Sequence, residues 1–178
     1  MKTSKNKKIK PQSIARALAF QALYQEELNP RFTEIDWQEL LDDYCAETQT
    51  IIPNIDNAEV IRFARRLFDG VVDNKVRIDE ILNKSLDKRT LKQTTVVDRN
   101  ILRVATYEIV TIETAKAIVI SEALELGKKF GDNGSRAFLN GVLDQVDKTS
   151  QVKPVSFKIL PTESHDLNTK VVDSESNV

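Results

Sequence analysis

Residues 96–109, which read VVDRNILRVATYEI, carry a strongly apolar stripe. The apolar side chains recur three or four residues apart, which is the spacing of one face of an α-helix. Thr94 and Thr95 precede the stripe, and either hydroxyl suits a helix N-cap. The stretch therefore predicts a helix that starts after one of these threonines and carries Val97, Ile101, Leu102, Ala105, Ile109 and Ile112.

Two further helices are expected on the carboxyl side of this stretch. One runs from about Lys116 to Phe130, with Gly131 placed to end it and two lysines complementing the dipole of its last turn. Its segment IVI (118–120) suits a strand when taken alone, but the continuation SEALELGKK favours a helix. The other helix runs from Ser135 to about Val146.

Four helices are expected on the amino side, separated by turn residues. Asn29-Pro30 ends the first, and Thr33 can cap the second. No segment has an evident partner strand, so we predict an all-α chain of about seven helices. The four amino-side helices are expected at residues 14–28, from Thr33 to about Tyr44, from about Asn57 to Val71, and at 78–86, with 49–56 as a connector.

Composition excludes several classes of protein. The chain has 178 residues, which suits one ordinary domain or two small packed halves. Its single cysteine, Cys45, excludes an internal disulfide, and its single histidine, His165, lies in a polar stretch, so histidine catalysis and Cys/His metal sites lack essential parts. No apolar run approaches the roughly 18 residues of a membrane span. We expect neither an enzyme nor a cofactor, and a reduced, cytoplasmic setting.

Charge is arranged in blocks although the total is close to zero. Residues 1–16 carry six bases and no acid, whereas residues 31–60 carry eight acids and one base. The amino-terminal lysines imitate a signal peptide, but Arg16 and Gln21 interrupt its apolar region, so an amphipathic helix is expected there. The sequence predicts a basic flexible arm, a helical domain and a disordered polar tail, at residues 1–11, 12–148 and 149–178.

Two features suggest an anionic ligand. The lysine-rich arm that leads to Arg16 suits a phosphate backbone through counterion release, although such runs are also common as solvated tails. The loop GDNGSR (131–136) has residues that permit left-handed turns, and Ser135 with the next amides suits an anion. The alternative for this loop is a tight helix connection with an N-cap.

Four separated motifs occur in an order that resembles the NusB family of bacterial transcription antitermination factors. They are ARALAFQALYQ (15–25), VVDRNILRVATYEI (96–109), AIVISEALELGKKFG (117–131) and SRAFLNGVLD (135–144). The resemblance covers roughly residues 12–147. It implies about seven helices in two packed subdomains, binding to the boxA element of nascent RNA, and pairing with NusE, a small-subunit ribosomal protein.

The same resemblance implies loading onto the RNA polymerase elongation complex with other Nus factors, notably in ribosomal RNA operons, with no covalent chemistry. A homodimer is a further possibility that it raises. The alternative from another class is a helical protein–protein adaptor that has lost specific RNA recognition.

By resemblance, RNA contacts fall on the start of the first helix and on the loop before the last one. The family's arginine-rich run is here Gln12 to Arg16, with one arginine, so we expect the upstream lysines to keep affinity with weaker geometric selectivity. In the loop, the family often has a basic residue at the place of Ala137, whereas in this sequence the basic residue is Arg136. The residues assigned to RNA are Lys5, Lys7, Lys8, Lys10, Arg16, Ser135, Arg136 and Phe138.

The resemblance places the NusE surface at Tyr24, Asp98 and Arg99. Other roles stay open: Asp98 can serve the helix dipole, and Tyr24 can be a half-buried core aromatic. Phe138 suits core packing as well as stacking on an unpaired base. Some motif residues are expected to be architectural, namely Arg103, Glu108 and Glu122 as internal helix-pairing charges and Asn140-Gly141 as a site of close helix approach.

Overall fold

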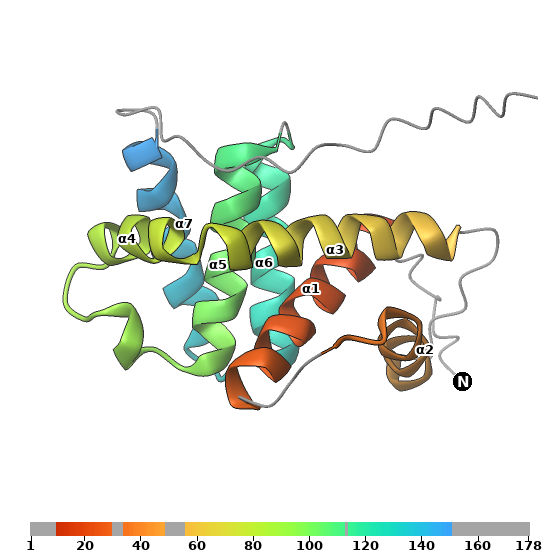
Figure 1. The fold of residues 1–178 in the computed structure, drawn as a ribbon. Helices are drawn as coiled ribbons and strands as arrows, with labels where there is room; N and C mark the ends of the chain where they lie inside the picture. The colour runs from red at the N-terminus through yellow and green to blue at the C-terminus, as the bar shows by residue number, and fades with distance from the viewer. Residues whose placement is uncertain (1–9, 30–33, 49–55, 113, 151–178) are drawn as a thin grey trace, which may run out of the picture.

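The computed structural model describes residues 10–29, 34–48, 56–112 and 114–150. Within these ranges the chain is all-α and forms no strand, so the predicted fold class is confirmed (Figure 1). The elements are α1 (Pro11–Leu28), α2 (Trp37–Thr48), α3 (Asn57–Asp73), α4 (Lys75–Ser85), the 3-10 turn η1 (Leu91–Gln93), α5 (Val96–Thr111), α6 (Lys116–Phe130) and α7 (Ser135–Ser150).

The helix ends follow local capping chemistry. Thr95 is the N-cap of α5, because its Oγ1 accepts the Asp98 N–H at 3.0 Å. The predicted Thr33 cap of α2 is wrong: Thr33 lies outside the described residues, and the helix starts later, at Trp37. Asp36 caps it instead, since its Oδ1 accepts the N–H groups of the second and third helical residues at 3.0 Å each.

Helix α5 is the centre of the molecule. It packs against α1, α3, α4, α6 and α7, and every residue from Asn100 to Ile109 is buried. A helix buried on all sides must pair its polar side chains internally, because an unpaired buried polar group is costly. Residues Asn100 to Ile109 of the sequence motif are therefore surrounded by protein.

The other helices are arranged around α5 in two groups. Helices α1, α2 and α3 pack together, and α4 packs with α5 and α7, which contact α6. Figure 1 shows α4 continuing from α3 in one row, with α3 crossing in front of α5 and α6 and α4 beside α7. In the described part of the chain, no helix combines the length and apolar character that a bilayer crossing requires.

Glycines serve close packing here instead of left-handed turns. None of the five has φ in the left-handed range, so the glycines of the 131–136 loop do not make the left-handed turns that the sequence permits there. A Cβ on Gly70 would lie 2.0 Å from Tyr107 Cζ, and one on Gly127 would lie 2.4 Å from Leu139 Cδ1. The expectation for Asn140-Gly141 is wrong, because a Cβ on Gly141 would meet no atom within 4 Å. Close helix approach occurs at α3–α5 and α6–α7 through Gly70 and Gly127.

Candidate nucleic-acid and partner interfaces

Arg16, one of the residues assigned to RNA, lies inside the molecule. Its side chain is 6% exposed and makes a bidentate pair with Glu108, at 2.7 Å from Nε to Oε2 and 2.6 Å from Nη2 to Oε1. The Phe63 ring lies 5.7 Å from the guanidinium carbon, and Glu122 Oε2 lies 3.8 Å from Nη1. These contacts agree with the internal role expected of Glu108 and Glu122, and they extend that role to Arg16.

The burial of Arg16 follows from its helix. Residues Ile14 to Phe20 of α1 are all buried, because α3, α5 and α6 surround this part of the helix. An arginine here needs an anion, and fully buried Glu108 supplies both carboxylate oxygens. The structure thus gives Arg16 a stabilising contact between α1 and α5 and leaves its guanidinium almost no exposed surface.

The loop before α7 is a closed capping structure. Asp132 Oδ1 accepts the N–H groups of Gly134 at 2.8 Å and Ser135 at 3.0 Å, and Ser135 Oγ accepts the Asp132 N–H at 3.0 Å. A protein carboxylate therefore accepts the Ser135 N–H, the first of the amides that the sequence suggested for an external anion. Ser135 is 1% exposed, so the geometry favours the capping alternative for it.

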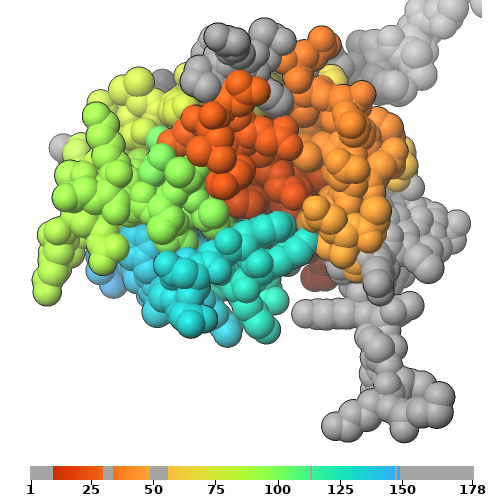
Figure 2. All heavy atoms as spheres, turned by 90° about the horizontal axis from the view of Figure 1, so that it is seen from below, coloured from red at the N-terminus to blue at the C-terminus, as the bar shows by residue number. Residues whose placement is uncertain are grey.

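Two other predicted RNA residues lie on the described surface. Lys10 and Arg136 are exposed, whereas Lys5, Lys7 and Lys8 lie outside the described residues. Phe138 is half-buried against the core, and the Arg89 guanidinium lies 5.2 Å from its ring centroid. Figure 2 shows the green atoms of the segment that follows α4 beside blue atoms from the region of α7. Sequence reasoning missed Arg89, although its three basic neighbours in the sequence segment 84–92 were a signal for it.

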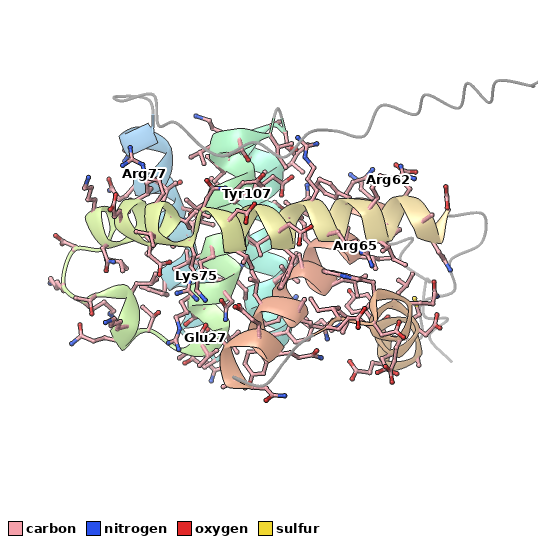
Figure 3. All side chains as sticks on the ribbon, viewed as in Figure 1. Glu27, Arg62, Arg65, Lys75, Arg77 and Tyr107 are labelled. Atoms are coloured by element: carbon pink, nitrogen blue, oxygen red, sulfur yellow. The ribbon has the colours of Figure 1, made fainter. Side chains whose placement is uncertain are left out.

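A second ionic cluster lies where α1 ends. Glu27 accepts hydrogen bonds from Arg99 Nε at 2.6 Å, Asn100 Nδ2 at 2.8 Å and Arg103 Nη1 at 2.9 Å. Arg103 also makes a bidentate pair with Asp79 of α4, at 2.8 and 2.9 Å. The cluster ties α1, α4 and α5 together, and Figure 3 shows Glu27 and Lys75 on the same side of the molecule. Arg103 thus has the internal role expected of it.

Burial and neighbouring charges shift the pKa values of Glu27 and Arg103 in opposite directions. Burial raises the pKa of Glu27, but hydrogen bonds from Arg99 and Asn100 and the charges of Arg103 and Arg99 leave that pKa below its ordinary value. For Arg103, burial lowers the pKa, whereas the hydrogen bond and charge of Asp79, with Glu27, leave it raised. The ionised forms are therefore the stable ones in the fold.

The three residues assigned to the partner surface have different surroundings. Tyr24 is half-buried beside the Phe20 ring, with centroids 6.2 Å apart, and Arg99 is held by Glu27 and by the Thr94 carbonyl. Asp98 is 5% exposed, and its Oδ1 has no hydrogen-bond partner among the residues that the structure describes. The carboxylate lies in the first turn of α5, where the helix dipole favours a negative charge.

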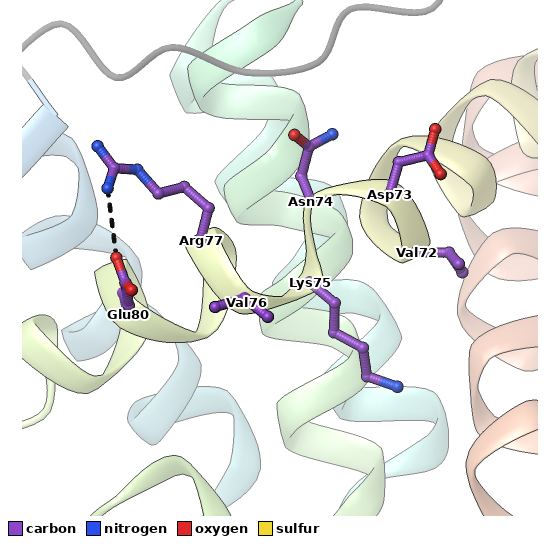
Figure 4. A pocket seen from close by; sticks show the side chains of 7 residues that line it. All are labelled: Val72, Asp73, Asn74, Lys75, Val76, Arg77 and Glu80. Carbon is purple, nitrogen blue, oxygen red and sulfur yellow. Dashed lines mark hydrogen bonds and ion pairs between the residues drawn. The ribbon is translucent and has the colours of Figure 1, made fainter.

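Hollows on the described surface lie at the α3–α4 junction and beside the Glu27 cluster. One of about 240 Å³ lies at the α3–α4 junction, where Arg77 Nη1 pairs with Glu80 Oε2 at 3.3 Å (Figure 4). A larger groove of about 610 Å³ runs beside the Glu27 cluster and includes Asn83 and Lys92. Among the described residues, no group of three or more His, Cys, Asp or Glu side chains suits a metal ion.

Comparison with known proteins gives a consistent set of relatives. The model of the NusB family matches residues 13–148. The chain is 38% identical over 136 residues to the transcription antitermination protein NusB of Bacillus cereus strain B4264. The aligned region covers 76% of this chain and 95% of that protein. The NusB proteins of Bacillus anthracis strains give the same identity and coverage.

Solved structures of NusB proteins are also similar to this chain. T. maritima NusB is 32% identical with a TM-score of 0.62 and covers 78% of this chain and 92% of its own. A crystal structure of antitermination factors NusB and NusE in complex with dsRNA contains a chain that is 26% identical, with a TM-score of 0.61, and covers 78% of this chain and 97% of its own.

Proposed function

This chain belongs to the NusB family, and from that premise we propose that it is a transcription antitermination factor that binds boxA-type RNA together with NusE. In this proposal the pair joins the RNA polymerase elongation complex with other Nus factors in the bacterial cytoplasm. It suppresses premature termination there, notably in ribosomal RNA operons. The protein binds and assembles, and it carries out no covalent chemistry.

The observation that carries the proposal is the extent of the similarity. The Bacillus cereus relative matches over 95% of its length, so the likeness extends over almost all of that antitermination protein instead of one shared motif. The complex of NusB and NusE with dsRNA supports the same pair of ligands, because the likeness covers 97% of the NusB-like chain there.

Exposed charge supports a surface for RNA. Lys10 at the start of α1 and Arg136 at the start of α7 are both exposed, and the lysines that precede Lys10 add charge to the arm at residues 1–11. Phosphate contacts by such residues give affinity that falls with salt. We propose residues 12–148 as the binding domain, with the tail at 149–178 outside this function.

A direct titration tests the proposal. Short single-stranded boxA RNA is titrated with the full chain, with and without NusE, at several salt concentrations, and scrambled RNA is the control. We expect tighter binding with NusE, preference over the scrambled RNA, and a clear loss of affinity as salt rises. Absence of RNA binding in the presence of NusE at low salt would refute the proposal.

A second candidate, a protein–protein adaptor without specific RNA recognition, is favoured by one observation. Arg16 is the only arginine of the expected RNA-binding run, and Glu108 binds its guanidinium. The adaptor predicts binding to NusE with no preference between boxA and scrambled RNA. Replacing Lys5, Lys7, Lys8 and Lys10 with Ala then leaves RNA affinity unchanged, whereas the antitermination proposal predicts weaker binding and a flatter salt dependence.

A further inference from the structure

The contact between Arg89 and Phe138 joins two segments that are far apart in the sequence. Arg89 lies in the connection between α4 and η1, and Phe138 lies in the first turns of α7. The guanidinium carbon is 5.2 Å from the ring centroid, within the range of a cation–π contact. The guanidinium carbon therefore lies over the ring.

The rest of the Arg89 guanidinium is free to bind a ligand. The residue is exposed, and no hydrogen bond or ion pair engages its guanidinium within the described part of the chain. This differs from Arg16, Arg99 and Arg103, each of which a carboxylate holds. Arg89 is thus a planar cation placed over a ring, and its hydrogen-bond donors have no partner among the described residues.

The surroundings favour a polyanion. Residues 84–92 carry four basic side chains and one acidic side chain, and Arg136 is exposed two residues before Phe138. The acid closest to Arg136 in the loop, Asp132, is engaged in capping α7. The local charge therefore attracts phosphate, while the exposed guanidinium plane matches the flat face of a nucleobase.

We propose that Arg89 is a stacking platform for an unpaired base of the bound RNA. Phe138 supports the inner face of the guanidinium, the base stacks on the outer face, and Lys84, Lys88, Lys92 and Arg136 hold the flanking phosphates. This inference rests on the proposed RNA-binding function and adds to it a base-recognition position outside the lysine arm and the loop. Phe138 acts through Arg89, so it is a positioning residue here.

Substitutions at Arg89 test the platform. The probe is single-stranded boxA RNA with one 2-aminopurine placed at each position in turn, titrated with the full chain and NusE. Arg89→Ala is expected to weaken binding about tenfold and to abolish the fluorescence quenching of one 2-aminopurine position. Arg89→Lys keeps the charge but lacks the plane, so it is expected to retain the salt dependence and lose the quenching.

Two further variants make the test specific. Arg77→Ala removes an equal charge from α4, where the side chain pairs with Glu80 instead of a ring, and it is expected to leave the quenching unchanged. Phe138→Leu keeps an apolar contact with the core, and it is expected to weaken the quenching because the guanidinium loses its support. Thermal unfolding of each variant identifies any that does not fold.

The outcomes separate the two proposals. If the Arg89→Lys variant binds RNA as tightly as the wild type and quenches the 2-aminopurine fully, a positive charge alone is sufficient at this position, and the platform is overturned. Unchanged affinity in a folded Arg89→Ala variant overturns it as well. If the wild type with NusE binds no RNA at low salt, the proposed function itself fails, and the platform falls with it.

Discussion

The interface between α1 and α5 holds two ionic clusters that differ in their access to water. At one end, Arg16 and Glu108 have side chains that are 6% and 0% exposed. At the other end, the side chain of Glu27 is 21% exposed beside a groove, and it is shared by Arg99 and Arg103. Both clusters connect the same two helices, but only one of them borders solvent. We call Arg16 and Glu108 the sealed pair, and Glu27 with Arg99 and Arg103 the outer cluster.

This difference shows why a charged residue in a sequence motif does not by itself indicate a ligand. The sealed pair cannot exchange its protein partner for RNA without leaving a charge unpaired in the core. In the outer cluster, water can replace part of a hydrogen bond that is lost, because the Glu27 side chain is partly exposed. A ligand role thus suits exposed cations such as Lys10 and Arg136 better than it suits Arg16.

The largest expected effect comes from breaking the sealed pair. Glu108→Gln leaves the Arg16 charge without its bidentate partner, and Glu122 at 3.8 Å replaces it only in part. Loss of one partner of a buried pair is expected to lower the free energy of unfolding by about 3 kcal/mol. Urea denaturation measures the change.

Glu122→Gln is the matched control for this prediction. Its side chain is 23% exposed and its contact with Arg16 is long, so it is expected to cost less than about 1 kcal/mol. Equal losses in the two variants would contradict the contrast between the sealed pair and its more exposed neighbour.

A smaller effect is expected in the outer cluster. Glu27→Gln removes the charge that holds Arg99 but leaves Arg103 paired with Asp79. Hydrogen bonds to charged groups contribute about 1.5–3 kcal/mol, and partial hydration offsets some of that loss, so we expect a cost of about 1–2 kcal/mol in urea denaturation. A loss equal to that of Glu108→Gln would mean that water access does not separate the clusters.

Local patterns predicted much of the fold. The bounds of α6 and the Thr95 cap of α5 follow from apolar spacing and capping chemistry, and both are as expected. Internal pairing was expected for Arg103, Glu108 and Glu122, but the sequence did not identify their partners across the fold. Periodicity along α1 does not reveal that Glu108, 92 residues away, binds Arg16, and Gly70 gave no sequence signal for its contact with Tyr107.

The outer cluster also predicts a dependence of stability on acid. Because the folded-state pKa of Glu27 lies below the ordinary value of 4.5, the ionised carboxylate stabilises the fold above that value, and the stabilisation is lost as pH falls through the folded-state pKa. The gap in unfolding free energy between wild type and Glu27→Gln is expected to be full at about pH 7 and to close in acid. Urea denaturation over this pH range measures it, and a gap that widens in acid would contradict the prediction.

The smallest expected effect comes from replacing both members of the sealed pair. Arg16→Met with Glu108→Leu removes two charges of opposite sign and puts apolar side chains of similar length in a site that is already dry. Such exchanges are often neutral or stabilising, so the double variant is expected within about 1 kcal/mol of the wild type. If Arg16 acts only inside the fold, RNA affinity with NusE is unchanged as well, as measured in the same boxA titration. A double variant that keeps its stability but loses RNA affinity would show that Arg16 takes part in RNA binding. Burial of the sealed pair would then not separate its role from that of exposed cations.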